Sequence, residues 1–157
     1  MKINYINGDA TIPQAEGNKI ICHICNDIGG WGRGFVVAIS KRWKEPEKNF
    51  REWYSDRSHN DFALGAVQLV QVEDDLYVAN LIGQHKLKST SDGPPIRYEA
   101  VETGLKTIAQ KAKELNASIH MPRIGCGLAG GKWENIEPML INHFIEKAIS
   151  VTVYDFG

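Results

Sequence analysis

The feature that most constrains the fold is a continuous apolar run, Lys19 to Cys25, with the sequence KIICHIC. Strands buried on both faces have this pattern, because helices cover both sides of a largely parallel sheet. The run therefore predicts an inner strand of an α/β protein. Within it, Cys22-His23-Ile24-Cys25 has the spacing of half a zinc site, but no second Cys/His pair follows at ligand spacing. We expect these cysteines to be buried as small apolar residues and to hold no metal.

Short β-rich runs alternate with helical patterns along the rest of the chain. Further strands are expected at Ile3–Ile6, Gly65–Val72, Leu76–Ile82, Ser118–Pro122 and Ser150–Phe156. Helices are expected at Phe35–Trp43, from Glu47 to about Tyr54, at Arg97–Asn116, and from near Glu134 with Ile136, Leu140, Phe144 and Ala148 on one face. Pro138 is compatible with the last helix only in its first turn. Strands separated by helices predict an α/β fold, a three-layer α/β/α sandwich with a mixed central sheet.

Length and charge limit the possible partners. The chain has 157 residues, which fits a single domain spanning 1–157. Its 18 basic and 19 acidic residues leave a net charge of −1, which disfavours nucleic acid or an anionic membrane as the main partner. Three cysteines, no signal peptide and no long apolar run predict a cytoplasmic protein. The sequence does not determine the oligomeric state.

Glycine placement is the strongest indication of function. Of 15 glycines, four lie in Gly29–Gly34 and four in Gly125–Gly131, and each cluster follows an expected strand and precedes an expected helix. Glycine permits positive φ and lets a ligand approach the backbone, whose N–H groups at a helix start attract phosphate. Ligands of α/β sheets bind at the carboxyl ends of strands. The clusters predict a diphosphate cradle on one crevice; two tight strand–helix turns are the alternative.

Neither cluster fits a standard nucleotide motif. No Gly-Lys-Ser/Thr follows, as a P-loop requires, and Gly30-Trp31-Gly32-Arg33-Gly34 lacks the final spacing of the dinucleotide fingerprint. The predicted cradle is therefore of another kind.

Four motifs in chain order resemble the macrodomain family. They are Asn7-Gly8-Asp9, His23-Ile24-Cys25-Asn26, Met121-Pro122-Arg123-Ile124-Gly125-Cys126-Gly127-Leu128 and Val151-Thr152-Val153-Tyr154. The similarity spans nearly the whole chain. It is closest to the branch of terminal ADP-ribose protein-glutamate hydrolases, DNA ADP-ribosylation-reversing antitoxins and ADP-ribose 1″-phosphate phosphatases. The resemblance implies binding of ADP-ribose, free or attached to protein, with no cofactor.

The resemblance also implies roles for single residues. Asp9 would accept a hydrogen bond from the adenine amino group, or else only form an Asx turn. Asn26 would contact the distal ribose, or form a turn. Phe156 would stack on the base or plug the core, and Trp31, flanked by glycines, is expected at the ligand. The other implied binding residues are Ala10, Gly30, Gly32, Gly34, Pro122, Ile124, Gly125, Cys126, Gly127 and Leu128.

The catalytic groups of the hydrolase branch are missing. That branch uses a lysine after the strand that matches Val78–Ile82, where this chain has Gly83-Gln84. It also uses an aspartate after Gly-Cys-Gly-Leu, where this chain has Ala129. Glutamine and alanine supply neither the amine nor the carboxylate that this chemistry needs.

The phosphatase-like branch matches better. His23, at the end of a buried strand, would act as general base or acid, unless it is a hydrogen-bonded core histidine. Asp27 is the second catalytic candidate, with capping of a turn as its alternative. His85 lies in a loop and is interpreted as incidental. The favoured function is binding of ADP-ribose with hydrolysis of ADP-ribose 1″-phosphate; a non-catalytic ADP-ribose reader and a de-ADP-ribosylating hydrolase are the alternatives.

Overall fold

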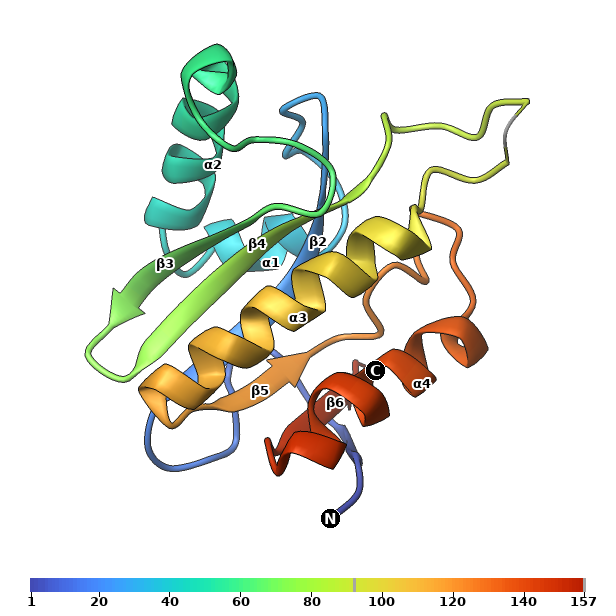
Figure 1. Ribbon diagram of the computed structural model, residues 1–157. Helices are drawn as coiled ribbons and strands as arrows, with labels where there is room; N and C mark the ends of the chain where they lie inside the picture. The colour runs from blue at the N-terminus through green and yellow to red at the C-terminus, as the bar shows by residue number, and fades with distance from the viewer. Residues whose placement is uncertain (92, 157) are drawn as a thin grey trace.

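A computed structural model describes residues 1–91 and 93–156 (Figure 1). Its centre is a six-stranded sheet in the order β1-β6-β5-β2-β4-β3. The strands are β1 Asn4–Asn7, β2 Lys19–Asn26, β3 Val67–Glu73, β4 Leu76–Gln84, β5 Ser118–Met121 and β6 Val151–Asp155. All neighbouring strands are parallel except β3 and β4, which form an antiparallel pair. The predicted mixed sheet is confirmed.

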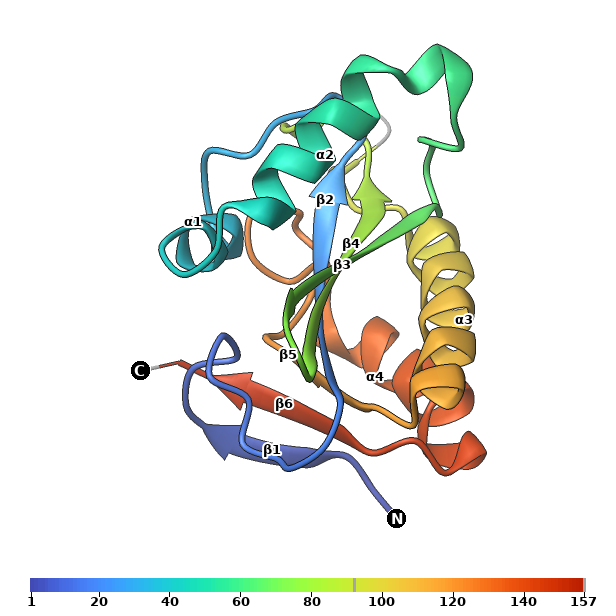
Figure 2. The same ribbon diagram turned by 90° about the vertical axis from the view of Figure 1, so that its left-hand side faces the viewer.

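Helices cover both faces of this sheet (Figure 2). They are α1 Phe35–Ser40, α2 Glu45–Ser55, α3 Tyr98–Leu115 and α4 Trp133–His143, with the 3₁₀ turns η1 Arg57–His59 and η2 Ile145–Lys147. Helices α1 and α2 lie on one face, and α3 and α4 lie on the other. Each face has its own hydrophobic cluster. The predicted three-layer α/β/α sandwich is therefore confirmed.

Strand β2 is buried on both faces, as its apolar sequence predicts. Ile20 and Cys22 belong to the cluster under α3, whereas Ile21 and Cys25 belong to the cluster under α2. This division follows from the pleat of a strand, in which successive side chains point to opposite faces. His23 has the same parity as Ile21 and therefore points toward α2.

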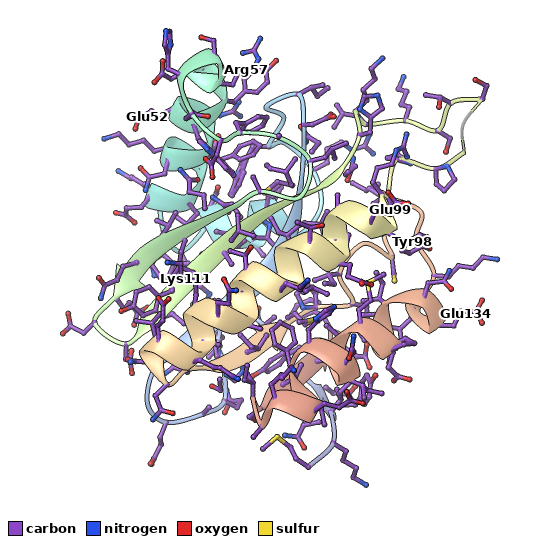
Figure 3. All side chains as sticks on the ribbon, viewed as in Figure 1. Glu52, Arg57, Tyr98, Glu99, Lys111 and Glu134 are labelled. Carbon is purple, nitrogen blue, oxygen red and sulfur yellow. The ribbon has the colours of Figure 1, made fainter. Side chains whose placement is uncertain are left out.

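Helix α3 is the longest helix and carries the predicted apolar stripe. Val101, Leu105 and Ile108 are fully buried along it. The helix ends at Leu115, and the next residue, Asn116, adopts the left-handed conformation with φ 52° that often terminates helices. Its outer face carries charged side chains such as Glu99 and Lys111 (Figure 3). None of the helices in the described part of the chain is long and apolar enough to cross a membrane.

The helix boundaries differ from the sequence prediction in three places. Helix α1 ends at Ser40 rather than at Trp43, and α2 begins at Glu45 with Pro46 in its first turn. Helix α4 begins at Trp133, which puts Pro138 beyond the first turn. Pro138 is exposed, and its missing N–H leaves the Glu134 carbonyl without its usual partner within the helix. Ala148 lies after η2 with φ 60° and is exposed rather than on the buried face.

Candidate functional site

The two glycine clusters lie together at one edge of the sheet. The first glycine loop (Gly29–Gly34) follows β2, and the second glycine loop (Gly125–Gly131) follows β5. Because β2 and β5 are parallel neighbours, both loops leave the same edge, called here the carboxyl edge. A Cβ atom on Gly34 would lie 3.4 Å from Cδ1 of Leu128, so the two loops approach van der Waals contact. Both loops therefore lie at the same edge of the sheet, whereas a diphosphate crevice between them stays a prediction.

The first glycine loop is closed by the side chain of Asn26. Its Nδ2 donates to the Gly30 carbonyl at 2.9 Å. Its Oδ1 accepts from the N–H groups of Gly30 at 2.9 Å and Ile28 at 3.1 Å. These bonds establish the turn-forming role and occupy both lone pairs of Oδ1, which leaves one Nδ2 hydrogen for a ligand. Contact of Asn26 with a ribose stays a prediction.

The second glycine loop is closed by its own backbone. The N–H of Gly131 donates to the Gly125 carbonyl at 2.7 Å, and the N–H of Gly130 donates to the Gly127 carbonyl at 3.0 Å. A Cβ on Gly131 would lie 2.5 Å from that Gly125 oxygen, so this turn excludes any side chain. Ile124 is buried beneath the loop, whereas Gly127 and Leu128 are exposed.

Several backbone N–H groups of the two loops are left for a ligand. Within the described residues, no backbone hydrogen bond is donated by Gly32, Arg33 and Gly34 of the first loop or by Gly127, Leu128 and Ala129 of the second. Successive free N–H groups in a turn form a concave site for anions. The second loop ends before α4 begins, so its N–H groups come from the loop itself rather than from the helix start.

A partly open cavity lies beside the loops. It measures about 650 Å³, within the range of small-molecule sites. It is lined by Gly8, Asp9, Ala10 and Thr11 after β1, by Phe35, Ala38, Lys41 and Arg42 of or next to α1, and by Pro122, Tyr154 and Phe156. The sequence-predicted residues Asp9, Ala10, Pro122 and Phe156 are thus brought together here, in a cavity that borders α1.

Asp9 both forms a turn and faces this cavity. Its Oδ1 accepts from the Thr11 N–H at 2.8 Å and from the Thr11 hydroxyl at 2.7 Å, while Oδ2 lies 3.6 Å from the Arg42 guanidinium. Burial raises the pKa of Asp9, but the Thr11 hydrogen bonds and Arg42 outweigh burial and lower the pKa overall. The carboxylate is therefore charged at neutral pH and can still accept a hydrogen bond through Oδ2.

Phe156 lies at the mouth of the cavity with 85% of its surface exposed. It does not plug the core, so that alternative is wrong. An exposed ring on a cavity rim is available to stack on a flat ligand.

Trp31 is a core residue, contrary to the expected ligand contact. Only 5% of it is exposed, and its ring packs at 5.3 Å from Phe50 and edge-on at 5.4 Å from His23. Its Nε1 donates to the Ser40 hydroxyl at 2.7 Å. The flanking glycines let the chain turn so that the indole enters the space between β2 and α2.

His23 is likewise a core residue. Its Nε2 lies 2.6 Å from Oδ1 of Asn80, and the ring does not line the cavity. Burial lowers the pKa of His23 to about 4, although the hydrogen bond to Asn80 acts in the opposite direction. The alternative of a hydrogen-bonded core histidine describes this residue, and the structure gives no support to its role as an acid or base.

Asp27 has a partner that the sequence does not predict. Its Oδ2 lies 2.6 Å from Nδ1 of His85, and its Oδ1 accepts from the Lys86 N–H at 2.8 Å. His85, interpreted above as incidental, is thus fixed by a carboxylate. The register of the sheet brings them together, because Asn26 pairs with Gln84, and Asp27 and His85 directly follow β2 and β4.

Gln84 and Ala129 stand at the positions of the hydrolase lysine and aspartate, and each makes a hydrogen bond within the protein. Gln84 donates through Nε2 to the Lys86 carbonyl, and Ala129 is buried with its carbonyl accepting from Ile96. Lys86 adopts a positive φ of 59°.

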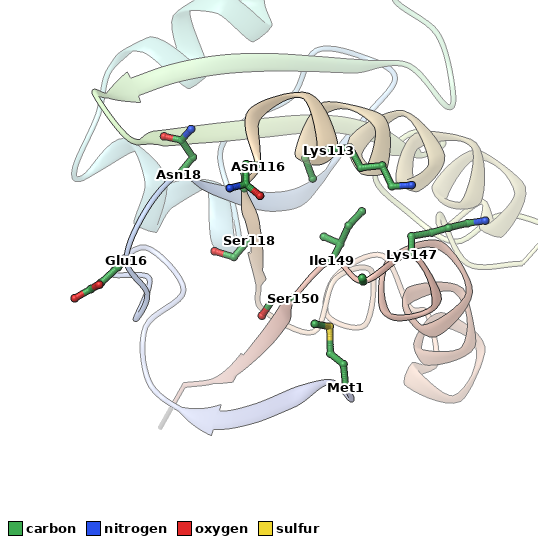
Figure 4. A pocket seen from close by; sticks show the side chains of 12 residues that line it. Met1, Glu16, Asn18, Lys113, Asn116, Ser118, Lys147, Ile149 and Ser150 are labelled. Carbon is green, nitrogen blue, oxygen red and sulfur yellow. The ribbon is translucent and has the colours of Figure 1, made fainter.

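A second, smaller cavity lies at the opposite edge of the sheet (Figure 4). It measures about 350 Å³ and is lined by residues at or just before the starts of β2, β5 and β6, among them Asn18, Ser118 and Ser150. It contains none of the sequence-predicted site residues.

No group of three His, Cys, Asp or Glu side chains placed to hold a metal ion is present in the described residues. Burial raises the pKa of the Cys22 thiol to about 12, so the thiol stays protonated at neutral pH. Cys22 and Cys25 therefore serve as small apolar core residues.

The fold is a three-layer α/β/α domain whose candidate ligand site lies at the carboxyl ends of parallel strands. No family model matches the chain. The chain is 53% identical to a macrodomain protein from Streptomyces coelicolor over 99% of its own length and 100% of that chain, with a TM-score of 0.90. A Bacteroides thetaiotaomicron protein of unknown function is 58% identical, with a TM-score of 0.95 and coverage of 99% and 98%. The chain belongs to the macrodomain family.

The curated relatives that the chain matches are proteins whose names give different activities. A mouse chromodomain-helicase-DNA-binding protein 1-like is 35% identical over 98% of this chain, which spans only 18% of that protein's length. An ADP-ribose 1″-phosphate phosphatase from Lodderomyces elongisporus is 28% identical over 89% of this chain and 91% of its own. A human ADP-ribose glycohydrolase is 26% identical over 98% and 91%.

Proposed function

We propose that this protein binds ADP-ribose along the carboxyl edge of its sheet and hydrolyses ADP-ribose 1″-phosphate to ADP-ribose and phosphate. The observation that carries the proposal is the set of free backbone N–H groups on two loops in close approach, directly beside a cavity of about 650 Å³. Relatives named as ADP-ribose 1″-phosphate phosphatases and a glycohydrolase support it. The ligand is ADP-ribose, free or carried by a protein.

The shape of the edge suggests one direction for the ligand. The adenine would occupy the cavity, with its amino group toward Asp9 and its face toward Phe156. The diphosphate would accept hydrogen bonds from the two glycine loops. The second ribose would then lie past the loops, near the remaining Nδ2 hydrogen of Asn26. In this proposal residues 1–157 act as one domain in the cytoplasm, and no metal or cofactor takes part.

A non-catalytic reader is the second candidate. The observation that favours it concerns two positions where catalytic groups are expected. His23 is buried in the core, and Ala129 has no carboxylate where the hydrolases have an aspartate. A reader would use the same cradle. The de-ADP-ribosylating hydrolase, which the human relative's name suggests, differs in cleaving a bond at the distal ribose rather than a phosphate ester.

The test combines calorimetric titration with a phosphate-release assay. ADP-ribose should bind with one site per chain, and ADP should bind at least about tenfold more tightly than GDP, because guanine presents an oxygen where adenine presents the amino group that Asp9 accepts. Phosphate release from ADP-ribose 1″-phosphate separates the phosphatase from the reader. Absence of ADP-ribose binding at millimolar concentration would contradict the whole proposal.

A further inference from the structure

We propose that His85, oriented by Asp27, is the acid–base residue of the hydrolysis. This inference rests on the proposed function and assigns a chemical group to its site. It starts from the shortest histidine–carboxylate contact in the described residues, His85 to Asp27 at 2.6 Å.

Main-chain hydrogen bonds hold both members of the pair. The N–H of Asp27 donates to the Gln84 carbonyl at 3.0 Å, and the N–H of His85 donates to the Pro95 carbonyl at 2.8 Å. The two residues directly follow β2 and β4, which run side by side in Figure 1. The pair is therefore fixed by the sheet itself, although each residue lies in a connection. Residues held in this way keep the orientation that proton transfer requires.

The hydrogen bond defines which nitrogen of the imidazole reacts. Nδ1 of His85 lies 2.6 Å from Oδ2 of Asp27, and a carboxylate at this distance holds the proton on Nδ1. Nε2 then carries the lone pair, and in the described residues it has no hydrogen-bond partner. The His85 side chain is 38% exposed and Asp27 is 17% exposed, so solvent reaches the imidazole while the carboxylate is largely shielded. The same carboxylate stabilises the imidazolium that forms when Nε2 takes up a proton.

The order of the strands places this pair at the far end of the cradle. Along the carboxyl edge, β1 and β6 lead to the cavity, β5 leads to the second glycine loop, β2 leads to the first, and β4 leads to His85. An ADP-ribose with its adenine in the cavity and its diphosphate at the loops therefore directs its second ribose toward β4. The first glycine loop also approaches the segment that follows His85. A Cβ on Gly30 would lie 3.5 Å from Cδ2 of Leu87, two residues after His85.

The proposed step is a balanced hydrolysis. Nε2 of His85 removes a proton from water as the water oxygen bonds to the phosphorus of the 1″-phosphate. The bond between phosphorus and the oxygen on C1″ breaks, and that oxygen takes the proton back from Nε2. The products are ADP-ribose and inorganic phosphate, and His85 returns to its starting state.

The central experiment replaces His85 and measures binding separately from turnover. His85→Gln keeps an N–H that can reach Asp27. It should leave the Kd for ADP-ribose within about threefold while lowering kcat for phosphate release by about 100-fold or more, which is the usual contribution of acid–base catalysis. Imidazole added to His85→Ala should restore part of kcat, because free base replaces the missing side chain. A purely structural role would give no such rescue.

Two further variants make the test specific. Asp27→Asn should lower kcat with little change in KM, because Asp27 acts as a positioning residue through His85. His59→Gln is the matched control, since His59 also pairs with an aspartate, Asp56 at 3.1 Å, but on the exposed turn η1. This control should keep the wild-type kcat.

Each outcome decides between the two proposals. If His85→Gln keeps the wild-type kcat, or loses ADP-ribose binding in parallel with kcat, the role of His85 is overturned while the proposed function stands. If the wild-type protein binds ADP-ribose but releases no phosphate, the hydrolytic part of the proposed function and the role of His85 are both overturned, and the reader remains.

Discussion

The two glycine loops have the same number of glycines but are closed by different means. In the first loop a side chain, Asn26, bridges the turn with three hydrogen bonds. In the second loop the backbone closes on itself, and the space that a Cβ on Gly131 would need is taken by the Gly125 carbonyl and by Ile96. The comparison teaches that loops of similar composition are closed in two ways, the first by a polar side chain and the second by its own backbone.

The strands beneath the loops share one feature. Each carries a buried histidine, His23 on β2 and His120 on β5. His120 bonds to the Ser118 hydroxyl and to the hydroxyl of Tyr154, which lines the cavity. Burial and, to a smaller extent, the charge of Lys19 lower the pKa of His120 to about 4. The strand that leads to each loop therefore carries a histidine that stays neutral in the folded protein down to about pH 4.

Acidification should have the largest effect on the free energy of unfolding, and it should act through His23 and His120. Between pH 6.5 and pH 4 the unfolded chain binds a proton on each histidine, whereas the folded chain, with both pKa values near 4, does not. The free energy of unfolding therefore falls as the pH falls through this window, by about 5 kcal/mol at pH 4.5 for the two residues together. Urea unfolding at pH 7.5 and pH 4.5 measures the change.

Single replacements should show how much of the pH-dependent change in the free energy of unfolding comes from each histidine. His23→Gln and His120→Gln should each remove about half of the difference between the two pH values, because glutamine does not titrate. Exposed His59 supplies the control, since its replacement should leave the difference unchanged. A free energy of unfolding that is constant across this pH range would contradict the prediction.

Gly131→Ala should be the most damaging methyl group in either loop. The new Cβ would lie 2.5 Å from a backbone oxygen and 2.6 Å from Cδ1 of Ile96, and the backbone contact can be relieved only by moving the second glycine loop. We expect a loss of about 3 kcal/mol in the free energy of unfolding, together with weaker ADP-ribose binding. Chemical denaturation and calorimetry measure the two effects. Unchanged stability would show that the loop is looser than its contacts indicate.

Asn26→Ala should damage the first glycine loop by a smaller amount. The variant removes three hydrogen bonds, two of which leave the N–H and carbonyl of Gly30 unpaired, at a cost of about 2 kcal/mol. Asn26→Asp keeps the acceptor oxygen but loses the donor and adds a negative charge beside the proposed phosphate site. It should therefore weaken ADP-ribose binding more than it lowers stability. The two variants are compared by urea unfolding and by calorimetric titration.

Two open glycines should show the smallest change in stability. Gly32 and Gly127, one in each loop, have no atom within 4 Å of a built Cβ and no positive φ between +20° and +160°. Gly32→Ala and Gly127→Ala should each change the free energy of unfolding by less than about 0.5 kcal/mol. Each should weaken ADP-ribose binding about tenfold, because a methyl group would stand between the loop N–H groups and the phosphates. Equal affinity for wild type and both variants would indicate that the diphosphate does not touch the loops.

The sequence predicts the layers of this protein well because hydrophobic periodicity is a local property. The run KIICHIC of β2 and the apolar stripe of α3 each carry their own evidence, and both elements lie where they are expected. Helix boundaries near prolines are less predictable: Pro138 lies inside α4, although proline disfavours helix interiors.

The site was only partly predictable, for a different reason. Glycine spacing identifies the loops, but the direction of a single side chain depends on neighbours that are distant in sequence. Trp31 enters the core because Phe50 and Ser40 of other elements receive it. His85 meets Asp27 because β4 lies next to β2, an adjacency that no local pattern encodes. The family resemblance indicated the ligand but not these contacts.

The bonds made by Asn26 have a consequence for the kinetics of binding. Because Asn26 fixes the first glycine loop through three hydrogen bonds within the protein, little conformational entropy is lost when a ligand binds. Association should then approach the rates typical of rigid, preformed surfaces, and differences in affinity among ligands should lie mainly in how fast they leave. Free and occupied forms of the protein should superpose closely along this edge.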